Sequence, residues 1–121
     1  MAQIRIDNDN LILTMHGLRR VLALTSELTF PLSSVRGVTY DPNIQADYPS
    51  GLEKRKGTNI FNTYYGGRFK QDGDTIFWDV RKPEKTVVIT LDDDEYQRLI
   101  VEVDDPHETV KMIEEAINRA K

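Results

Sequence analysis

The sequence predicts a mainly β domain of the α+β class, in which a series of strands is followed by one amphipathic helix. Apolar residues alternate with polar ones along most of the chain, which is typical of half-buried strands. Only near the carboxyl end do apolar residues recur every three or four positions, as they do in a helix. The 121 residues are enough for one hydrophobic core, so we expect a single domain over residues 1–121.

Two short alternating runs around a turn predict a hairpin at the start of the chain. The turn cluster is DNDN at residues 7–10, and the apolar residues beside it are Ile4, Ile6, Leu11, Leu13 and Met15. Residues 17–27 are less regular and predict a short helical turn or connection. Residues 28–40 predict one bent strand, in which Pro31 cannot donate a ladder hydrogen bond and therefore indicates an edge or a bend.

Residues 41–59 contain two prolines, two glycines and no apolar periodicity, which predicts a long loop. Four extended stretches are expected after it: Ile60–Phe69, Thr75–Val80, Thr86–Leu91 and Gln97–Val103. Because their connections are short and polar, we expect these strands to form an antiparallel meander.

A helix is predicted from Asp105 onward. Asp105 is expected to cap it, Pro106 suits the first helical position, and Glu108 completes a capping box. Its apolar stripe comprises Val110, Ile113, Ile117 and Ala120. This stripe should lie against the sheet or barrel.

The segment YYGGRFKQDGDTIFW, residues 64–78, predicts a hairpin with a two-residue turn at Asp72 and Gly73. With that turn, Gln71 faces Asp74 and Gly67 faces Trp78. The predicted core face carries Tyr65, Gly67, Phe69, Ile76, Trp78 and Val80. The predicted solvent face carries Tyr64, Gly66, Arg68, Phe77 and Asp79, with Arg68 against the Phe77 ring. Gly67 is expected to leave room for the Trp78 indole.

The order of these elements resembles the pleckstrin-homology (PH)-like fold, and four stretches look like a group of small bacterial PH-like proteins. They are LTFPLSSVRGVTYDP, GDTIFWDV, TVVITL and YQRLIVEVDDP. The resemblance implies a bent, partly closed barrel of seven antiparallel strands, capped by a C-terminal α-helix. These phrases belong to core strands, so the resemblance indicates a fold without indicating an activity.

Two features differ from the PH domains that bind inositol phosphates. Those domains carry basic residues in the loop between their first two strands, whereas this chain has Asp7, Asn8, Asp9 and Asn10 there. We therefore expect no phosphoinositide binding by that route. Those domains also place a tryptophan in the final helix, whereas Trp78, the only tryptophan of this chain, lies on a predicted strand.

The composition excludes several kinds of functional site. The chain has no cysteine, which excludes disulfides, thiolate metal sites and cysteine nucleophiles and suggests a reducing compartment. His16 and His107 lack the spacing of zinc ligands, so we expect neither a metal nor a cofactor. The amino-terminal residues do not resemble a signal peptide, and no apolar run reaches membrane-spanning length. These features predict a cytoplasmic protein.

The net charge of −4 is unevenly distributed along the chain. Residues 1–49 carry 4 basic and 5 acidic side chains, residues 50–85 carry 8 and 5, and residues 86–121 carry 4 and 10. Only the middle segment is basic, so an anionic partner is expected to approach there if anywhere.

The short polar motifs do not predict catalysis or metal binding. Residues 51–58, GLEKRKGT, have five residues between their glycines and no lysine after the second, unlike a P-loop. The four acids Asp92–Glu95 lack the spacing of an EF-hand and predict a charged turn. No Gly-x-Ser-x-Gly elbow surrounds any of the serines Ser26, Ser33, Ser34 and Ser50. We therefore predict no catalytic residue.

The basic and aromatic segment from residue 54 to residue 70 is the strongest candidate for binding. Its candidate residues for a partner or an anion are Lys54, Arg55, Lys56, Tyr64, Arg68 and Lys70. Cations beside an aromatic ring can hold an anionic peptide or single-stranded nucleic acid, although no RNA-binding motif is present and the chain is acidic.

We expect a non-enzymatic binding or interaction module with a protein or peptide partner. One alternative is a small-ligand-binding protein or an enzyme with a pocket beside the 41–59 loop. Another is a weak binder of nucleic acid or anions through the 54–70 segment. Self-association is also considered, because Val88 and Ile100 fall on the outward phase of their predicted strands.

Overall fold

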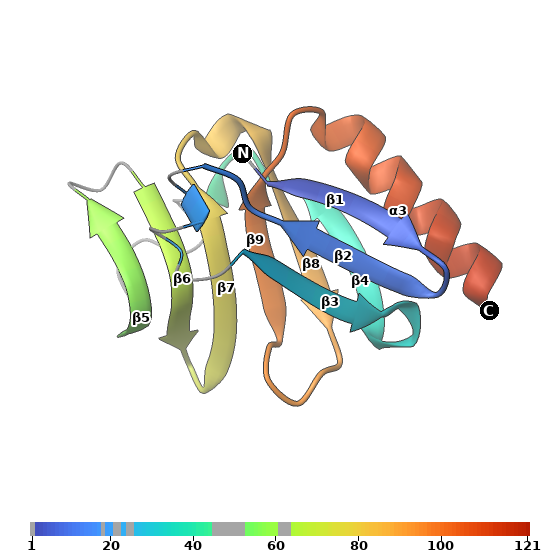
Figure 1. The fold of residues 1–121 in the computed structure, drawn as a ribbon, viewed down its shortest axis with the longest axis horizontal. Coiled ribbons are helices and arrows are strands. Elements are labelled where there is room, and N and C mark those ends of the chain that lie inside the picture. The colour runs from blue at the N-terminus through green and yellow to red at the C-terminus, as the bar shows by residue number, and fades with distance from the viewer. Residues whose placement is uncertain (1, 18, 21–22, 24–25, 45–52, 61–63) are drawn as a thin grey trace.

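The computed structural model describes residues 2–17, 19–20, 23, 26–44, 53–60 and 64–121, with residues 53–60 described as backbone only (Figure 1). The strands of the first half are β1 (Gln3–Asp7), β2 (Asn10–Thr14), β3 (Glu27–Pro31), β4 (Val35–Tyr40) and β5 (Glu53–Ile60). The later elements are β6 (Tyr64–Gln71), β7 (Asp74–Val80), β8 (Thr86–Leu91), β9 (Arg98–Glu102) and the helix α3 (Pro106–Ala120).

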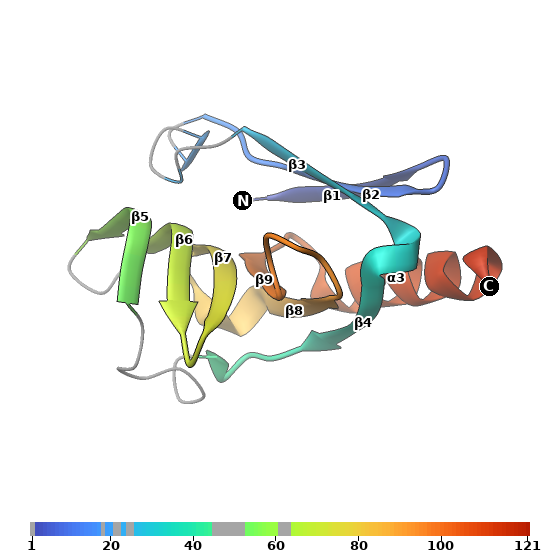
Figure 2. The ribbon, with the colours of Figure 1, turned by 90° about the horizontal axis from the view of Figure 1, so that it is seen from below.

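These strands form two sheets, which lie one above the other in Figure 2. One sheet has the order β1-β2-β3 and the other has the order β4-β8-β9-β7-β6-β5. The main core lies between the sheets, and α3 packs beside it, near β1 and β4 (Figure 1). The prediction of a mainly β domain capped by a C-terminal helix is confirmed. The described strands number nine rather than seven and do not close into a barrel.

The amino-terminal hairpin is confirmed. β1 pairs with β2 around a tight turn at Asn8 and Asp9, where Asn8 has a φ of 56°. The predicted strand over residues 28–40 is instead two strands, β3 and β4, which belong to different sheets. A 3₁₀ turn at Leu32–Ser34 redirects the chain between them, and Pro31 ends β3 at a sheet edge. The bend expected at Pro31 is therefore a crossing from one sheet to the other.

The predicted pairing of β6 with β7 is confirmed residue by residue, with Gln71 opposite Asp74 and Gly67 opposite Trp78. The predicted antiparallel meander is wrong, because β9 lies between β7 and β8. β9 runs parallel to β7 and antiparallel to β8. The chain therefore passes from β7 through β8 before returning to β7's other side.

The expected solvent face of this hairpin is wrong as well, because both faces of the six-stranded sheet are covered around β7. Tyr64, Phe77 and Asp79 are all buried, and Phe77 is part of the main core. The opposite face forms a second, smaller core of Ile44, Phe69, Ile76, Trp78, Val80 and Ile100. Since Ile100 is fully buried there and Val88 packs against this cluster, the pattern that suggested self-association is explained by folding.

The predicted 41–59 loop contains a strand. Residues 53–60 form β5 at the edge of the six-stranded sheet, paired with β6, and residues 45–52 lie outside the described part of the chain. Likewise, the single strand predicted over Ile60–Phe69 is divided between β5 and β6. An edge strand is stabilised by backbone pairing on one side and often carries charges, so it need not show apolar alternation.

The helix begins as predicted. The Asp105 carboxylate accepts a hydrogen bond from the Glu108 backbone N–H at 3.1 Å, and Pro106 occupies the first turn. Ile113 and Ala116 are buried against the core, whereas Ala120 is exposed. The apolar stripe is therefore shorter than expected at its carboxyl end.

Gly67 offers a test of this architecture because its φ is 110°, a backbone conformation that residues other than glycine rarely adopt. We expect Gly67→Val to lower the free energy of unfolding by about 1–3 kcal/mol, through backbone strain and crowding opposite Trp78. Thermal melts would measure the loss. Gly37→Val is the matched control, because Gly37 has open space around it and should tolerate the change. Equal losses in both variants would contradict this description of β6.

Candidate functional site

Four polar side chains from distant parts of the sequence meet at one end of the six-stranded sheet. Asp79 and Glu102 lie near the ends of the parallel neighbours β7 and β9. Tyr64 begins β6, and Arg19 comes from the connection between β2 and β3. We call these four residues the buried polar cluster.

Arg19 joins the two carboxylates of the cluster. Its Nη2 donates a hydrogen bond to Glu102 Oε1 at 2.8 Å, and its Nη1 lies 3.5 Å from Asp79 Oδ2. The Tyr64 hydroxyl donates to the other Asp79 oxygen, Oδ1, at 2.5 Å. The Arg19 guanidinium also lies 5.3 Å from the centre of the Tyr64 ring, within the range of a cation–π contact.

Glu102 is held by more than its ion pair. The same Oε1 atom accepts hydrogen bonds from the backbone N–H groups of Arg81 at 3.0 Å and Lys82 at 3.1 Å. These groups follow β7, so one carboxylate oxygen fixes the chain as it leaves that strand. Glu102 thereby links three separate segments of the fold.

Gly66 allows the Tyr64 ring to reach Asp79. Gly66 lies directly opposite Asp79 in the β6–β7 pair, and a Cβ atom at Gly66 would overlap the Tyr64 ring. The ring therefore lies across the space that any other residue at position 66 would fill. Gly66, the first glycine of YYGG, therefore has a packing role of its own, distinct from that of Gly67.

The two carboxyl groups respond oppositely to their surroundings. Burial raises the pKa of Asp79, and this effect exceeds the lowering by the Tyr64 hydrogen bond and the Arg19 charge. Burial alone would also raise the pKa of Glu102, but the hydrogen bonds from Arg19 and from two backbone N–H groups lower it below its ordinary value. Burial and the hydrogen bond to Asp79 raise the pKa of Tyr64, which keeps its hydroxyl a donor.

These shifts predict opposite pH dependences for two variants. A raised pKa means that stability from Asp79 is present below its unfolded pKa and is lost as pH rises through the folded value. A lowered pKa means that stability from Glu102 is present above its unfolded pKa and is lost as pH falls through the folded value.

We therefore compare each variant with the unmodified protein by the difference in their free energies of unfolding. As pH rises from about 3 to 8, this difference should shift in favour of Asp79→Asn and against Glu102→Gln. At neutral pH, Glu102→Gln should cost about 1–3 kcal/mol because charged hydrogen bonds are lost. Urea unfolding across this range measures both trends. Parallel pH profiles for the two variants would contradict the assigned shifts.

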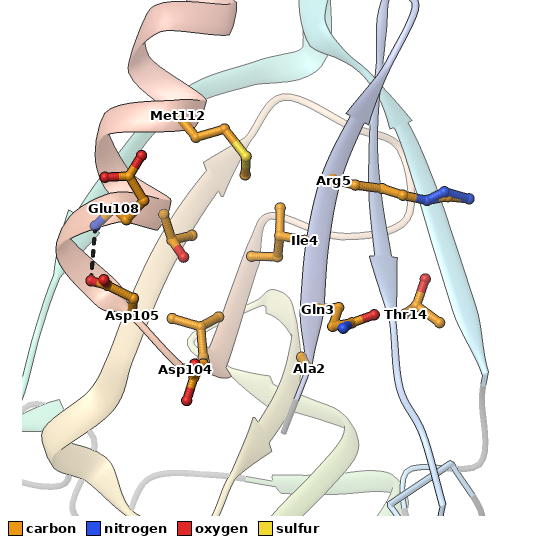
Figure 3. Close-up of a pocket in the computed structure, with 11 residues that line it drawn as sticks. Ala2, Gln3, Ile4, Arg5, Thr14, Asp104, Asp105, Glu108 and Met112 are labelled. Carbon is orange, nitrogen blue, oxygen red and sulfur yellow. Dashed lines mark hydrogen bonds between the residues drawn. The ribbon is translucent and has the colours of Figure 1, made fainter.

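A groove lies between β1 and the start of α3 (Figure 3). It encloses about 430 Å³, and its lining includes Ala2, Ile4, Val103, Asp104, Glu108 and Met112. Figure 3 shows Ile4 and Met112 directed into the space between the strand and the helix, whereas Arg5 points away from it. The groove therefore combines a sheet edge, apolar side chains and acidic groups.

The structure separates the residues predicted for binding. Tyr64 is only 5% exposed and belongs to the buried polar cluster, so its ring offers no free stacking surface. Arg68 lies 3.4 Å from Glu95 and 5.2 Å from the centre of the Tyr96 ring, rather than against Phe77. Lys70 is half-buried on β6. Lys54, Arg55 and Lys56 belong to β5, and their side chains lie outside the described part of the structure.

The acidic turn at Asp92–Glu95 has a structural role. Asp93 Oδ2 accepts hydrogen bonds from the backbone N–H groups of Glu95 and Tyr96, and Asp92 pairs with Arg36 at 2.7 Å. These contacts agree with the predicted charged turn. Among the described residues, no group of three histidine, aspartate or glutamate side chains is arranged to hold a metal ion.

A polar pocket also lies where residues 41–59 begin. It encloses about 430 Å³ and is lined in part by Asp41, Asp72, Asp74 and Arg98. Asp74 and Arg98 form an ion pair with each other at 3.0 Å. The charges of these two side chains are thus already matched within the fold.

Comparison with known proteins adds no assignment: no protein-family model, curated protein or solved structure matches this chain. The resemblance to small bacterial PH-like proteins therefore stays a prediction. None of the described helices has the length and apolar character needed to cross a membrane.

Proposed function

We propose that this protein is a non-enzymatic interaction module that binds an extended segment of a protein partner along β1. The observation that carries the proposal is the orientation of the β1 backbone toward the groove beside α3. The resemblance to PH-like interaction domains points in the same direction. Strand addition of this kind gives affinity through main-chain hydrogen bonds and selectivity through alternate side chains.

The turn of the first hairpin determines which backbone groups of β1 face outward. In a two-residue hairpin the flanking residues, here Asp7 and Asn10, exchange hydrogen bonds, and every second pair does the same. Gln3, Arg5 and Asp7 therefore bond to β2. Ile4 and Ile6 direct their N–H and C=O groups to the free edge.

A hydrogen bond at the start of β1 supports this assignment of inward and outward backbone groups. Ala2 lies two residues before Ile4, so its backbone groups face the same edge. Its N–H donates outward to the Glu102 carbonyl at 3.2 Å. β1 is thus already paired on its outer side at one point, where β9 ends. Beyond that point Gln3, Ile4 and Arg5 line the groove, so an added segment would extend an existing pattern of pairing there.

Proline substitutions can test strand addition because proline removes one backbone N–H. We expect Ile4→Pro to abolish selection of peptides from a displayed library of random dodecapeptides, since the outward N–H of residue 4 would be lost. Its fold should persist, because proline is tolerated on edge strands when the missing N–H faces outward. Circular dichroism and thermal melts would confirm that the variant remains folded.

Arg5→Pro is the matched control, because it removes an N–H that faces β2 instead of the free edge. Its N–H bonds inward to β2, so we expect a larger loss of thermal stability than in Ile4→Pro, by about 1 kcal/mol or more. If folded Ile4→Pro protein selected the same peptides as the unmodified protein with equal affinity, strand addition at β1 would be excluded.

A further inference from the structure

We infer that the segment bound along β1 is both apolar and basic, with at least one lysine or arginine next to an apolar residue. This inference rests on the proposed function and specifies the chemistry of the partner. Three features of the groove carry it: its apolar floor, its acidic wall and the short length of the free edge.

The apolar floor suits one inserted side chain. Ile4 and Met112 face each other across the groove (Figure 3), and Val103 also lines it. Ile4 and Met112 are partly buried and pack against the main core. A partner residue opposite Ile4 would point to the same face of the sheet as Ile4, and so toward this floor. Methionine adapts its shape to different apolar side chains, which suits a floor that receives a ligand.

The wall formed by α3 and the residues before it is acidic. Asp104, Asp105 and Glu108 line the groove, and Asp104 and Glu108 are exposed. Asp105 is committed to capping the helix. Within the described part of the chain, no cation lies within salt-bridge distance of Asp104 or Glu108; the nearby Arg5 turns away and faces Glu27 at 3.9 Å.

This wall complements a basic partner. The helix dipole accounts for acids in the first helical turn, but Asp104 precedes the cap and receives little from it. A lysine or arginine can cover apolar surface with its stem while its charged end reaches a carboxylate at the rim. Complementary charge of this kind raises specificity and the rate of association.

The occupant is a separate partner rather than a second copy of this chain. The basic strand of a second copy would be β5, which carries Lys54, Arg55 and Lys56. Pairing β5 of one copy with β1 of the next is a head-to-tail contact, which continues into a filament unless it closes into a ring. A short segment of another protein avoids that requirement, and a groove that β1 lines only from Gln3 to Arg5 suits a short segment.

The same dodecapeptide library tests the chemistry. We expect peptides selected on the unmodified protein to be enriched in lysine and arginine beside apolar residues. A selected peptide should bind about tenfold more weakly to the double variant Asp104→Asn with Glu108→Gln in isothermal titration calorimetry. Its affinity should fall as salt is added. Glutamine at position 108 keeps the capping-box pattern, so the helix should still form.

The control variant is Glu114→Gln with Glu115→Gln, which removes two exposed carboxylates from the same helix outside this groove. We expect it to change the affinity by less than about twofold. An equal loss in both double variants would show a general charge effect and overturn the inference.

Three other outcomes separate this inference from the proposed function. Selected peptides without basic enrichment, still lost in Ile4→Pro, would overturn the chemistry but retain strand addition. Basic peptides that bind Ile4→Pro unchanged would overturn strand addition. Concentration-dependent association in sedimentation equilibrium, abolished by Ile4→Pro, would make a second copy the occupant and overturn the inference.

Discussion

Arg19→Met should lower the free energy of unfolding by about 3–5 kcal/mol at neutral pH, the loss typical of breaking a buried ion pair by removing one partner. Methionine replaces much of the aliphatic stem but leaves Asp79 and Glu102 without their cation. Asp79 is 0% exposed, so water cannot substitute for the guanidinium without opening the fold. Urea unfolding would measure the loss.

Arg20→Met is the control, because Arg20 is the exposed neighbour of Arg19 on the same turn and should contribute under about 0.5 kcal/mol. Adding Asp79→Asn and Glu102→Gln to Arg19→Met should restore part of the lost stability, since no buried charge would then be unpaired. If Arg19→Met lost no more stability than Arg20→Met, the ion pairs of Arg19 would not be what stabilises the connection between β2 and β3.

The sequence predicted best where local chemistry determines structure. The Asp72-Gly73 turn specifies its own hairpin geometry, so the pairing of Gly67 with Trp78 followed from turn type alone. The helix start was equally predictable, because Asp105 and Glu108 form a local capping arrangement. Both features depend on residues within one or two turns of each other.

The sheet order could not be predicted because it depends on contacts between distant strands. The runs TIFWDV and LIVEV contain almost continuous apolar residues, a pattern typical of strands covered on both faces. That pattern, rather than alternation, indicated that Phe77 and Ile100 would both be buried. Interpreting the first run as half-buried assigned one face to solvent incorrectly.

The buried polar cluster left a partial signal in the same runs. Asp79 and Glu102 are single carboxylates within apolar stretches, and a buried carboxylate requires a partner. The identity of that partner was not readable, because Arg19 lies in an irregular segment far away in the sequence. The groove beside β1 was equally hidden, since it exists only where the first strand and the last helix come together.

Gly66→Ala should lower the free energy of unfolding by about 3 kcal/mol, although it adds a single methyl group. The new Cβ would overlap the Tyr64 ring, so the ring must move. Moving it breaks the hydrogen bond to Asp79, whose Oδ1 would be left buried without its donor. The cost therefore combines crowding with the loss of a charge-assisted hydrogen bond.

A double-mutant cycle with Tyr64→Ala isolates the contribution of the ring. In the Tyr64→Ala background the obstacle is absent, and Gly66→Ala should cost less than about 1 kcal/mol. Gly37→Ala, at a strand glycine with open space around it, should be nearly neutral in the unmodified protein. If Gly66→Ala cost the same with and without the Tyr64 ring, the ring would not be the source of the cost. The backbone would then constrain position 66, and Gly66 would not explain how the ring reaches Asp79.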